Sequence, residues 1–486
     1  MALQRERSMV MVALLATLLS AAGWWFGAQL HPVWWAAWLA PLPILWLATR
    51  VRARWVILAA LVASMIGSLQ QWHYIHDMLH LPLQALVPQF FGPALAFMLC
   101  ALLYRRLVLR GRPLAAALAV PVLWTAIFFI NGTLSHDGTW SDLAYSQMDA
   151  LAVIQIAAVT GLWGVGFIVM LAPATVAVLC ERTANARSRW QVVLVGGGLV
   201  VAALLYGGWR LHSADREPNT PVNIGLLALQ GPIHPSLDTP KGQDFLKRYV
   251  IALDTLASKG VQMVVMPEVT LTVSDPDIAE LAQVAQQHGI VLVTSVDYKP
   301  NVAGSATGAE RNMSIAFHPQ GGRPDTYFKH HLMSVVEDRF TPGDSYTVLD
   351  TTPRVGLVIC KDMDFPAMGP ANVAHGAQLL LVPAWDFYVD GWYHSRMAIM
   401  RGVESGLAIA RAARDGYLTL SDDRGRIIAQ IPSNQDIDVS LTGTLPVRQT
   451  STLYTRWGNW FGWLDLLVLL GLLTLAWLPR QSALTR

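Results

Sequence analysis

Long apolar runs dominate the first 212 residues of the chain, and one more lies close to the C-terminus. They fall near residues 8–30, 32–49, 55–72, 84–104, 113–131, 150–180, 190–210 and 461–479. About 20 helical residues cross a hydrocarbon core of about 30 Å, and a helix satisfies its own backbone polar groups inside lipid. The pattern therefore predicts a membrane α-helical bundle of about eight spans.

The first run admits a second interpretation. It follows Arg5 and Arg7, as the apolar part of a secretory signal peptide does, and Ser20-Ala-Ala-Gly resembles a cleavage site. We interpret it as a membrane anchor, because the run is long and further apolar runs follow at once.

Arginines gather in alternate loops between these runs. The loops after the first, third and fifth runs contain no Lys or Arg. The loops after the second, fourth and sixth runs carry Arg50, Arg52, Arg54, Arg105, Arg106, Arg110, Arg112, Arg182, Arg187 and Arg189. Because positive residues stay in the cytoplasm, we expect both termini inside and the segment after the seventh run outside. Arg480 and Arg486, after the eighth run, agree with this orientation.

The segment from about Ser213 to Tyr454 has mixed charge and alternates short strands with helices. Strands are predicted near 222–229, 261–266, 290–296, 313–317, 326–329, 355–359 and 378–382. Helices are predicted near 242–259, 274–288 with Ser274 as N-cap, 366–376 and 393–414, and a hairpin is predicted at 417–431. Strands that alternate with helices favour an α/β domain with covered sheets.

Composition agrees with an integral membrane protein. The chain is 53% hydrophobic and 14% charged, against about 25% charged in soluble domains, and its mean hydropathy is +0.39. The net charge of +2 and the lack of a basic-aromatic patch give no reason to expect nucleic-acid binding. Cys100 and Cys180 lie in apolar runs, so the polar segment has Cys360 alone and cannot contain an internal disulfide.

Three chemically useful residues stand at predicted strand ends, where sites assemble in α/β sheets. They are Glu268, Lys329 and Cys360. Phe365-Pro366 looks like a helix start behind Cys360, and a helix N-terminus lowers a thiol pKa. Each residue also has a structural explanation: a small packing residue for Cys360 and surface positions for the other two. Together they form a chemical set of base, oxyanion partner and nucleophile.

The motifs around these residues resemble the nitrilase, or carbon–nitrogen hydrolase, superfamily. Glu268 lies in Val-Met-Pro-Glu, Lys329 in Tyr-Phe-Lys-His-His-Leu and Cys360 in Ile-Cys-Lys-Asp. The resemblance implies a four-layer α-β-β-α sandwich and no metal or organic cofactor. It also implies that Glu268 is the general base and acid, Lys329 the oxyanion stabiliser and Cys360 the nucleophile. Glu337, eight residues past Lys329, would be the second glutamate, which orients the lysine and helps proton transfer.

A nitrilase-like domain between a seventh and an eighth span resembles the apolipoprotein N-acyltransferase family. Further matching motifs are Tyr145-Ser146-Gln147, Leu229-Gln230-Gly231, Gly376-Ala377-Gln378-Leu379-Leu380 and Thr452-Leu-Tyr-Thr-Arg-Trp-Gly-Asn-Trp460. The resemblance implies a multi-pass protein of the bacterial cytoplasmic (inner) membrane with an extracytoplasmic catalytic domain. It implies transfer of a fatty acyl chain from a phospholipid, through a thioester, to the N-terminal amine of a lipid-modified lipoprotein.

Apolar and aromatic residues near the motifs suit an acyl chain, although ordinary core packing also explains them. They are Met333, Val335, Val336, Phe340, Trp385, Phe387, Tyr388, Trp392 and Tyr393. We predict that they contribute to substrate binding.

Several segments depart from the family pattern. Lys361-Asp362 replaces Tyr-Glu after the cysteine, Pro383-Ala-Trp-Asp-Phe387 replaces Asn-Asp-Ala-Trp-Phe, and the stretch after Lys329 ends in Phe-Thr-Pro-Gly, as in soluble amidases. Of the Glu-Trp-Leu-Arg motif in span five, only Trp124 remains. These changes leave the donor and acceptor open.

Two other functions therefore stay as alternatives. One is a membrane-tethered amidase that acts on an unknown amide, in which water resolves the thioester. The other is a non-catalytic assembly or binding protein that has kept the fold. His330-His331 and His136-Asp137 lack a complete ligand set at usable spacing, so no metal site is expected.

These observations predict three regions. A seven-span bundle covers residues 1–212, a catalytic domain covers 213–456, and an eighth span with a cytoplasmic tail covers 457–486. The sequence gives no indication of oligomeric state.

Overall fold

The computed structural model describes residues 2–80, 83–181, 185–300, 309–334, 336–433 and 437–478, without the side chains of 2–8 and 83–85. The predictions on Arg182, Val335, Arg480 and Arg486, and on the side chains of Arg5 and Arg7, lie outside the described residues. The chain forms two compact units. The first contains residues 1–134, 141–212 and 459–486, and the second contains residues 135–140 and 213–458.

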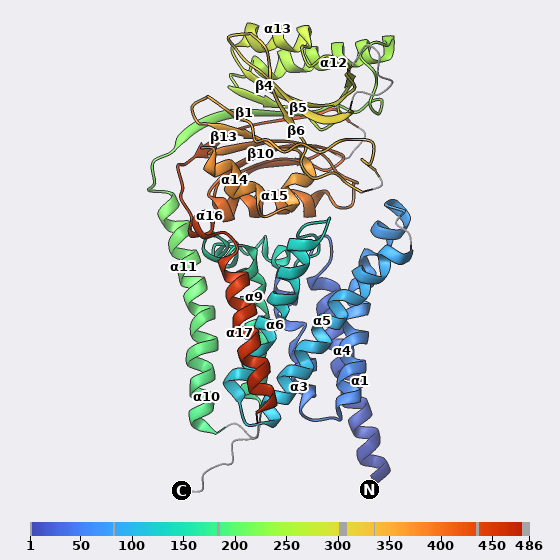
Figure 1. Cartoon of the computed structure of the whole chain (residues 1–486), viewed down its shortest axis with the longest axis vertical. Coiled ribbons are helices and arrows are strands. Elements are labelled where there is room, and N and C mark those ends of the chain that lie inside the picture. Colours follow the sequence, from blue (N-terminus) through green and yellow to red (C-terminus); the bar gives the residue numbers. More distant parts are fainter. Residues whose placement is uncertain are drawn as a thin grey trace. The chain divides into compact units, whose positions relative to one another are not determined.

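The first unit is helical (Figure 1). Among the residues that the structure describes, seven helices are long and apolar enough to cross a membrane. Their elements are α1 Ala2–Gly27, α4 Ala53–Ser68, α5 Leu83–Leu109, α6 Pro113–Leu134, α9 Leu162–Leu179, α10 Ala186–Val192 continued by η4 Val193–Gly197 and α11 Gly198–Ala214, and α17 Trp460–Trp477. The predicted fold class of this part, a bundle of apolar helices, is confirmed.

The second predicted run, 32–49, does not form one long helix. It folds as α2 Trp34–Leu39 and α3 Leu42–Ala48. Pro41 and Pro43 lack a backbone N–H, so they cannot donate the hydrogen bonds that would continue the ladder from α2. In the described part of the chain there are thus seven long helices, where the sequence predicts about eight spans.

The sixth predicted run, 150–180, is also divided. Two short helices, α7 Leu151–Ile154 and α8 Ala157–Thr160, precede α9. Gly161 separates α8 from α9 with a φ of 68°, a conformation that favours glycine.

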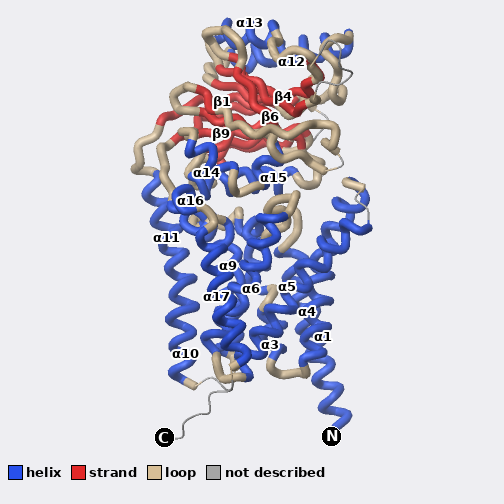
Figure 2. The backbone as a smooth tube through the Cα atoms, viewed as in Figure 1, coloured by secondary structure: helices blue, strands red, loops and turns tan. Residues whose placement is uncertain are grey.

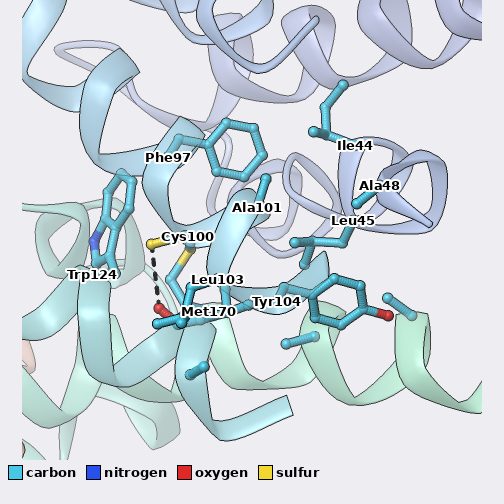
Figure 3. Packing of buried hydrophobic residues seen from close by; sticks show 14 of the residues in the cluster. Ile44, Leu45, Ala48, Phe97, Cys100, Ala101, Leu103, Tyr104, Trp124 and Met170 are labelled. Carbon is cyan, nitrogen blue, oxygen red and sulfur yellow. Dashed lines mark hydrogen bonds between the residues drawn. The ribbon is translucent and has the colours of Figure 1, made fainter. Parts of the chain in front are cut away.

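The helical unit has its own apolar core, part of which is shown in Figure 3. Phe97 and Cys100 of α5 are fully buried, and Trp124 of α6 stacks on Trp24 of α1 with 5.6 Å between ring centroids. The Cys100 thiol contacts the Val120 carbonyl oxygen at 3.5 Å. Because this cysteine is enclosed by apolar side chains, it acts as a packing residue.

Two β-sheets face each other in the second unit (Figure 2). The first sheet has the order β13-β1-β2-β4-β5-β6, with β3 on β4, and the second has the order β12-β11-β10-β9-β8-β7. The first is built from β1 Thr220–Ala228, β2 Met263–Val265, β3 Thr272–Val273, β4 Val291–Tyr298, β5 Arg311–Phe317, β6 Asp325–Phe328 and β13 Val439–Val447. The second is built from β7 Val348–Leu349, β8 Val355–Leu357, β9 Leu379–Trp385, β10 Ala408–Arg414, β11 Tyr417–Ser421 and β12 Ile427–Pro432.

Helices cover the outer faces of the sheets. The covering helices are α12 Pro240–Ala257 and α13 Ala279–His288 on the first sheet, and α14 Met368–Ala374 and α15 Gly391–Ser405 on the second. Along β1, Val222 and Ile224 pack between the two sheets, whereas Leu227 packs with α12, as the two-residue period of a strand requires. This α-β-β-α order confirms the fold class predicted for the polar segment.

The helix predicted over 393–414 is too long. α15 ends at Ser405, and Gly406 follows it with a left-handed φ of 72°. The next residues form β10, which pairs in parallel with β9 and antiparallel with β11. The Ala-rich run of β10 has high helix propensity, but its place between β9 and β11 in the second sheet overrides that preference, because strand formation depends on the surrounding sheet.

Three further strands were not predicted from the sequence. β7 pairs antiparallel with β8 through Val348 and Leu349. β3 pairs with β4 through Thr272 and Val273, so the helix predicted from Ser274 begins only at Ala279. β13 pairs antiparallel with the whole of β1. The predicted hairpin is confirmed, because β11 and β12 pair antiparallel.

Gly406→Ala should destabilise the second unit. A left-handed conformation costs a non-glycine residue about 1 kcal/mol, and the new Cβ would lie 2.8 Å from the Cβ and the carbonyl oxygen of Thr450. Gly260→Ala is a matched control, because Gly260 also has a positive φ, 77°, but has open space around it. We expect thermal unfolding of the detergent-solubilised protein to show a larger loss of Tm for Gly406→Ala. Equal losses would show that the contact with Thr450 has no effect.

Candidate active site

Three of the predicted catalytic residues meet at one end of the first sheet. Glu268 follows β2, Lys329 follows β6, and Glu337 lies in the loop beyond it. The Lys329 ammonium donates to Glu268 Oε1 and to Glu337 Oε2, at 2.7 Å each. The three residues are 4%, 3% and 7% exposed. A buried lysine is therefore paired with a carboxylate on each side, which is the condition under which charges are tolerated in an interior.

A buried asparagine joins the two carboxylates. Asn312 of β5 donates through Nδ2 to Glu268 Oε1 and to Glu337 Oε1, at 2.7 Å each. Its Oδ1 accepts from Ser295 Oγ at 2.8 Å, which fixes the orientation of the amide. The sequence interpretation missed Asn312. The available signal was weak, because Asn312 lies just before the strand that the sequence predicts over 313–317.

The surroundings give the two glutamates different pKa values. Burial raises the pKa of Glu268, and although Lys329 opposes this, the charge of Glu337 adds to it. Burial acts in the same direction on Glu337, but Lys329 and the backbone N–H of Met333 outweigh it and lower the pKa of Glu337. Burial acts to lower the pKa of Lys329, yet the two carboxylates keep that pKa well above its ordinary value. Glu268 is therefore the member best suited to exchange a proton.

Cys360 lies on an elbow between β8 and a short 3₁₀ turn, η5 Cys360–Asp364. Its φ of 37° is in the left-handed region, which is uncommon for a residue other than glycine and is found at functional sites. The thiol donates to the Trp385 carbonyl oxygen at 3.5 Å.

The elbow does not lower the thiol pKa as the sequence interpretation expected. Burial raises the pKa of Cys360 well above its ordinary value, and the charge of Glu268 raises it further, against a smaller opposing effect of Lys329. The resting sulfur is thus a neutral thiol that lies within the electrostatic field of both groups. A short 3₁₀ turn cannot offset the loss of hydration of a buried thiolate.

Asp362 holds the elbow from inside the domain. Its fully buried carboxylate accepts from the Ile359 N–H at 3.1 Å and the Tyr327 hydroxyl at 2.7 Å through Oδ2. Its Oδ1 accepts from the N–H groups of His330 and His331, at 3.1 Å and 2.9 Å. These bonds connect the elbow directly to the residues that follow Lys329. They also account for the two histidines, and within the described ranges no three His, Cys, Asp or Glu side chains gather to hold a metal ion.

The predicted acyl-chain residues lie in two loops and at the start of α15. The loop with Glu337 carries Met333, Val336 and Phe340, the loop after β9 carries Phe387 and Tyr388 beside Trp385, and α15 carries Trp392 and Tyr393. Phe340, Trp392 and Tyr393 are buried, whereas Val336 and Tyr388 are 54% and 58% exposed. The set therefore contains both packing residues and solvent-facing apolar side chains.

A buried ion pair beside this loop was also missed. Arg411 of β10 contacts Asp386 through two hydrogen bonds of 2.8 Å and 2.5 Å, next to the Trp385 carbonyl that accepts from Cys360. The positive charge of Arg411 also acts to lower the pKa of Cys360. The error has a simple origin, since the sequence interpretation assigned Arg411 to a helix.

Two family models match the chain in succession. The model described as "Apolipoprotein N-acyltransferase N-terminal domain" matches residues 20–175, and the model described as "Carbon-nitrogen hydrolase" matches residues 228–444. The second range includes Glu268, Lys329, Glu337 and Cys360.

Solved structures with a similar fold include a mutant of the amidase from Nesterenkonia sp. AN1, of the nitrilase superfamily. It is 22% identical, and the match covers 47% of this chain and 92% of that one with a TM-score of 0.39. Another is Saccharomyces cerevisiae Nit3, also of the nitrilase superfamily, at 22% identity over 46% of this chain and 90% of that one, with a TM-score of 0.39.

Curated relatives match both parts of the chain. Proteins named apolipoprotein N-acyltransferase from Rhodopseudomonas palustris and Geobacter metallireducens are 24% and 26% identical, covering 75% and 73% of this chain and 73% of each relative. The protein of that name from Pseudomonas aeruginosa is 26% identical over 76% of this chain and 77% of the relative. Both family models and these relatives point the same way, and the chain belongs to the apolipoprotein N-acyltransferase family.

Proposed function

We propose that this protein is a membrane enzyme that transfers a fatty acyl chain from a phospholipid to the N-terminal amine of a lipid-modified lipoprotein, through a thioester on Cys360. The observation that carries the proposal is the buried Glu268–Lys329–Glu337 cluster, in a chain of this family. The charges of Glu268 and Lys329 act on the Cys360 thiol. A thioester is a suitable intermediate between an ester donor and an amine acceptor, because an amine attacks a thioester readily.

The first half-reaction forms the thioester. Glu268 takes the proton from the Cys360 sulfur as that sulfur attacks the ester carbonyl of the phospholipid. The negative charge that develops on the carbonyl oxygen is stabilised by the Lys329 ammonium. When the intermediate collapses, the C–O bond breaks, and Glu268 returns its proton to the oxygen of the departing lysophospholipid.

The second half-reaction regenerates the enzyme. The acceptor amine attacks the thioester carbonyl and gives a proton to Glu268, the C–S bond breaks, and the proton passes to sulfur. One amide forms and one thioester is lost. Glu268 must therefore accept and release a proton in each half, which fits a carboxylic acid whose pKa is raised by burial.

Glu337 keeps Lys329 in place and charged. Because it carries a second negative charge at 2.7 Å from the ammonium, Lys329 remains an ammonium even when Glu268 holds a proton. This arrangement suits a lysine that acts as a fixed positive charge rather than as a proton donor.

We infer that the acyl chain lies against Met333, Val336, Phe340, Trp385, Phe387, Tyr388 and Trp392. The exposure of Val336 and Tyr388 supports this, because exposed apolar side chains beside a site are suited to an apolar ligand. Among the comparisons, the hydrolytic alternative has only a distant likeness of fold, at 22% identity, and that likeness does not indicate the reaction.

Exposure to a phospholipid of defined chain length should add one fatty-acyl mass to the protein. The thioester should be released by hydroxylamine and discharged by a diacylated lipopeptide. Cys360→Ala should acquire no such mass. Cys180→Ala is the control and should still acquire it, because Cys180 is a free and exposed cysteine outside the proposed site. Intact-mass spectrometry makes the measurement. A label on Cys360→Ala would refute the nucleophile, and release of free fatty acid without transfer would favour the hydrolytic alternative.

Loading of Cys360 should depend on the ionisation of Glu268. Only the carboxylate takes the thiol proton, so the rate should fall as the pH drops through the pKa of Glu268, which burial raises above the ordinary glutamate range. The pH profile of kcat/KM for loading measures this inflection. Glu268→Gln should lose about 10²- to 10⁴-fold in rate and the inflection with it. An unchanged profile in Glu268→Gln would exclude Glu268 as the base.

We further propose that the catalytic domain is extracytoplasmic and that both termini are cytoplasmic, on the basis of the arginine-bearing loops. In a Cys360→Ala background, Thr255→Cys should react with a membrane-impermeant thiol reagent in spheroplasts, because Thr255 is exposed on α12. Cys180 should react only after the membrane is disrupted. The reverse pattern would contradict the orientation.

A further inference from the structure

Lys361, the residue after Cys360, forms two ion pairs in this structure. Its Nζ lies 3.1 Å from Asp137 Oδ1 and 3.6 Å from Asp364 Oδ2. The Lys361 side chain is only 12% exposed. The position is one of the two at which this chain departs from the family pattern of Tyr-Glu after the cysteine, so these contacts are a property of this sequence.

Asp137 belongs to a segment that comes from the middle of the helical part of the chain. Residues 135–140 follow α6 in sequence, yet they form part of the same compact unit as Cys360. The segment is fixed to the end of η5 by Thr139, whose N–H and hydroxyl both donate to the Asp364 carbonyl oxygen, at 3.0 Å and 2.7 Å. Gly138 allows this approach: with a φ of 57°, it would place a Cβ 2.6 Å from the same oxygen.

A histidine continues the network on the other side of Asp364. His394 Nδ1 lies 3.7 Å from Asp364 Oδ1, and His394 Nε2 lies 3.1 Å from Asp390 Oδ2. Asp390 in turn accepts from the backbone N–H of Phe387 at 2.8 Å. Trp140 of the same segment packs against the His394 ring, with 5.1 Å between centroids. Burial acts to lower the pKa of His394, but Asp390 and Asp364 outweigh it and raise that pKa to about 10, so the charged groups alternate in sign from Asp137 to Asp390.

This network contacts the Cys360 elbow through Lys361 and Asp364, whereas Asp362 makes a separate set of contacts. Asp362 ties the elbow to the residues after Lys329, whereas Lys361 and Asp364 tie it to residues 135–140 and α15. The left-handed φ of Cys360 is a conformation that persists only when surrounding contacts enforce it. Both sets of contacts are therefore in a position to set the direction of the sulfur.

We propose that Asp137 and Lys361 are a positioning pair for the nucleophile, through which the segment 135–140 holds the Cys360 elbow in its reactive geometry. The inference rests on the proposed function, since it takes Cys360 to be the residue that is acylated. Neither residue touches the substrate in this proposal. They act through the backbone of Cys360, and the segment that follows α6 becomes a part of the catalytic unit.

The pair is expected to matter for rate more than for stability. Asp137 is 67% exposed, and ion pairs open to water contribute little to the free energy of unfolding. A small change in the direction of a reacting atom, in contrast, has a large effect on rate.

The test measures the rate of acyl loading of the full-length protein by intact mass, with a phospholipid of defined acyl chain. Lys361→Met should slow loading about tenfold at saturating phospholipid, with no change in the half-saturating concentration or in the final extent of loading. Asp137→Ala should slow it less, because the contact with Asp364 remains. The double variant should be no slower than Lys361→Met, because the interaction is already lost.

Three variants separate positioning from folding. Lys361→Arg should keep most of the rate, since a guanidinium can reach both carboxylates. Lys247→Met is the matched control, because Lys247 Nζ forms a 3.3 Å ion pair with Asp244 Oδ1 on the exposed face of α12. This variant should load at the full rate. Gly138→Ala should slow loading from a position that is 222 residues before Cys360 in the sequence.

The proposal is overturned if Lys361→Met loads at the full rate, if the two single effects multiply in the double variant, or if only the final extent falls. The last result would mean a purely structural role. A label that persists in Cys360→Ala would instead refute the proposed function, because Cys360 would not be the acylated residue. The coupling between Asp137 and Lys361 could still be measured by its effect on transfer to the lipopeptide.

Discussion

The site depends on one interaction, the burial of the Lys329 ammonium between two carboxylates. A charge removed from water is tolerated only where partners replace the lost hydration, and Lys329 has Glu268 and Glu337 at 2.7 Å each. This requirement brings together the end of β2, the end of β6 and the loop that follows. Asn312 and Ser295 extend this hydrogen-bonded network into the interior of the first sheet. Loss of either carboxylate would leave the buried ammonium with a single carboxylate partner, so the five positions constrain one another.

The second sheet contributes the sulfur under a different constraint. Cys360 takes a left-handed conformation, and the fully buried Asp362 accepts from the N–H of Ile359, just before it, and from the N–H of His330, just after Lys329. The thiol is neutral at rest because burial disfavours the thiolate. The two aspartates of the elbow make different contacts. Asp362 faces the interior, and the carbonyl oxygen of Asp364 accepts from Thr139 in the segment 135–140.

The structure shows which contacts are made by the two residues that depart from the family pattern after the cysteine. Asp362 is one methylene shorter than the usual glutamate, and it still meets four donors from residues 327, 330, 331 and 359. Lys361 carries a charge where the family has an aromatic residue, and an aspartate 224 residues earlier in the chain accompanies it. Both altered residues that follow the cysteine thus have partners in the structure.

From the sequence alone, the class of each part could be predicted and the candidate reactive groups could be proposed. Apolar runs of sufficient length predict helices because lipid leaves the backbone no other partner, and alternation of apolar residues predicts strands such as β1. Glu268, Lys329, Glu337 and Cys360 were identified because their motifs resemble a known superfamily. The sequence did not reveal β10, whose alanines favour a helix, nor Asn312, Arg411 or Asp137, which act through partners far away in the chain. Those contacts, the neutral state of the thiol and the charged state of Lys329 were decided by the tertiary structure, because desolvation and hydrogen bonding depend on what surrounds a group and not on its neighbours in sequence.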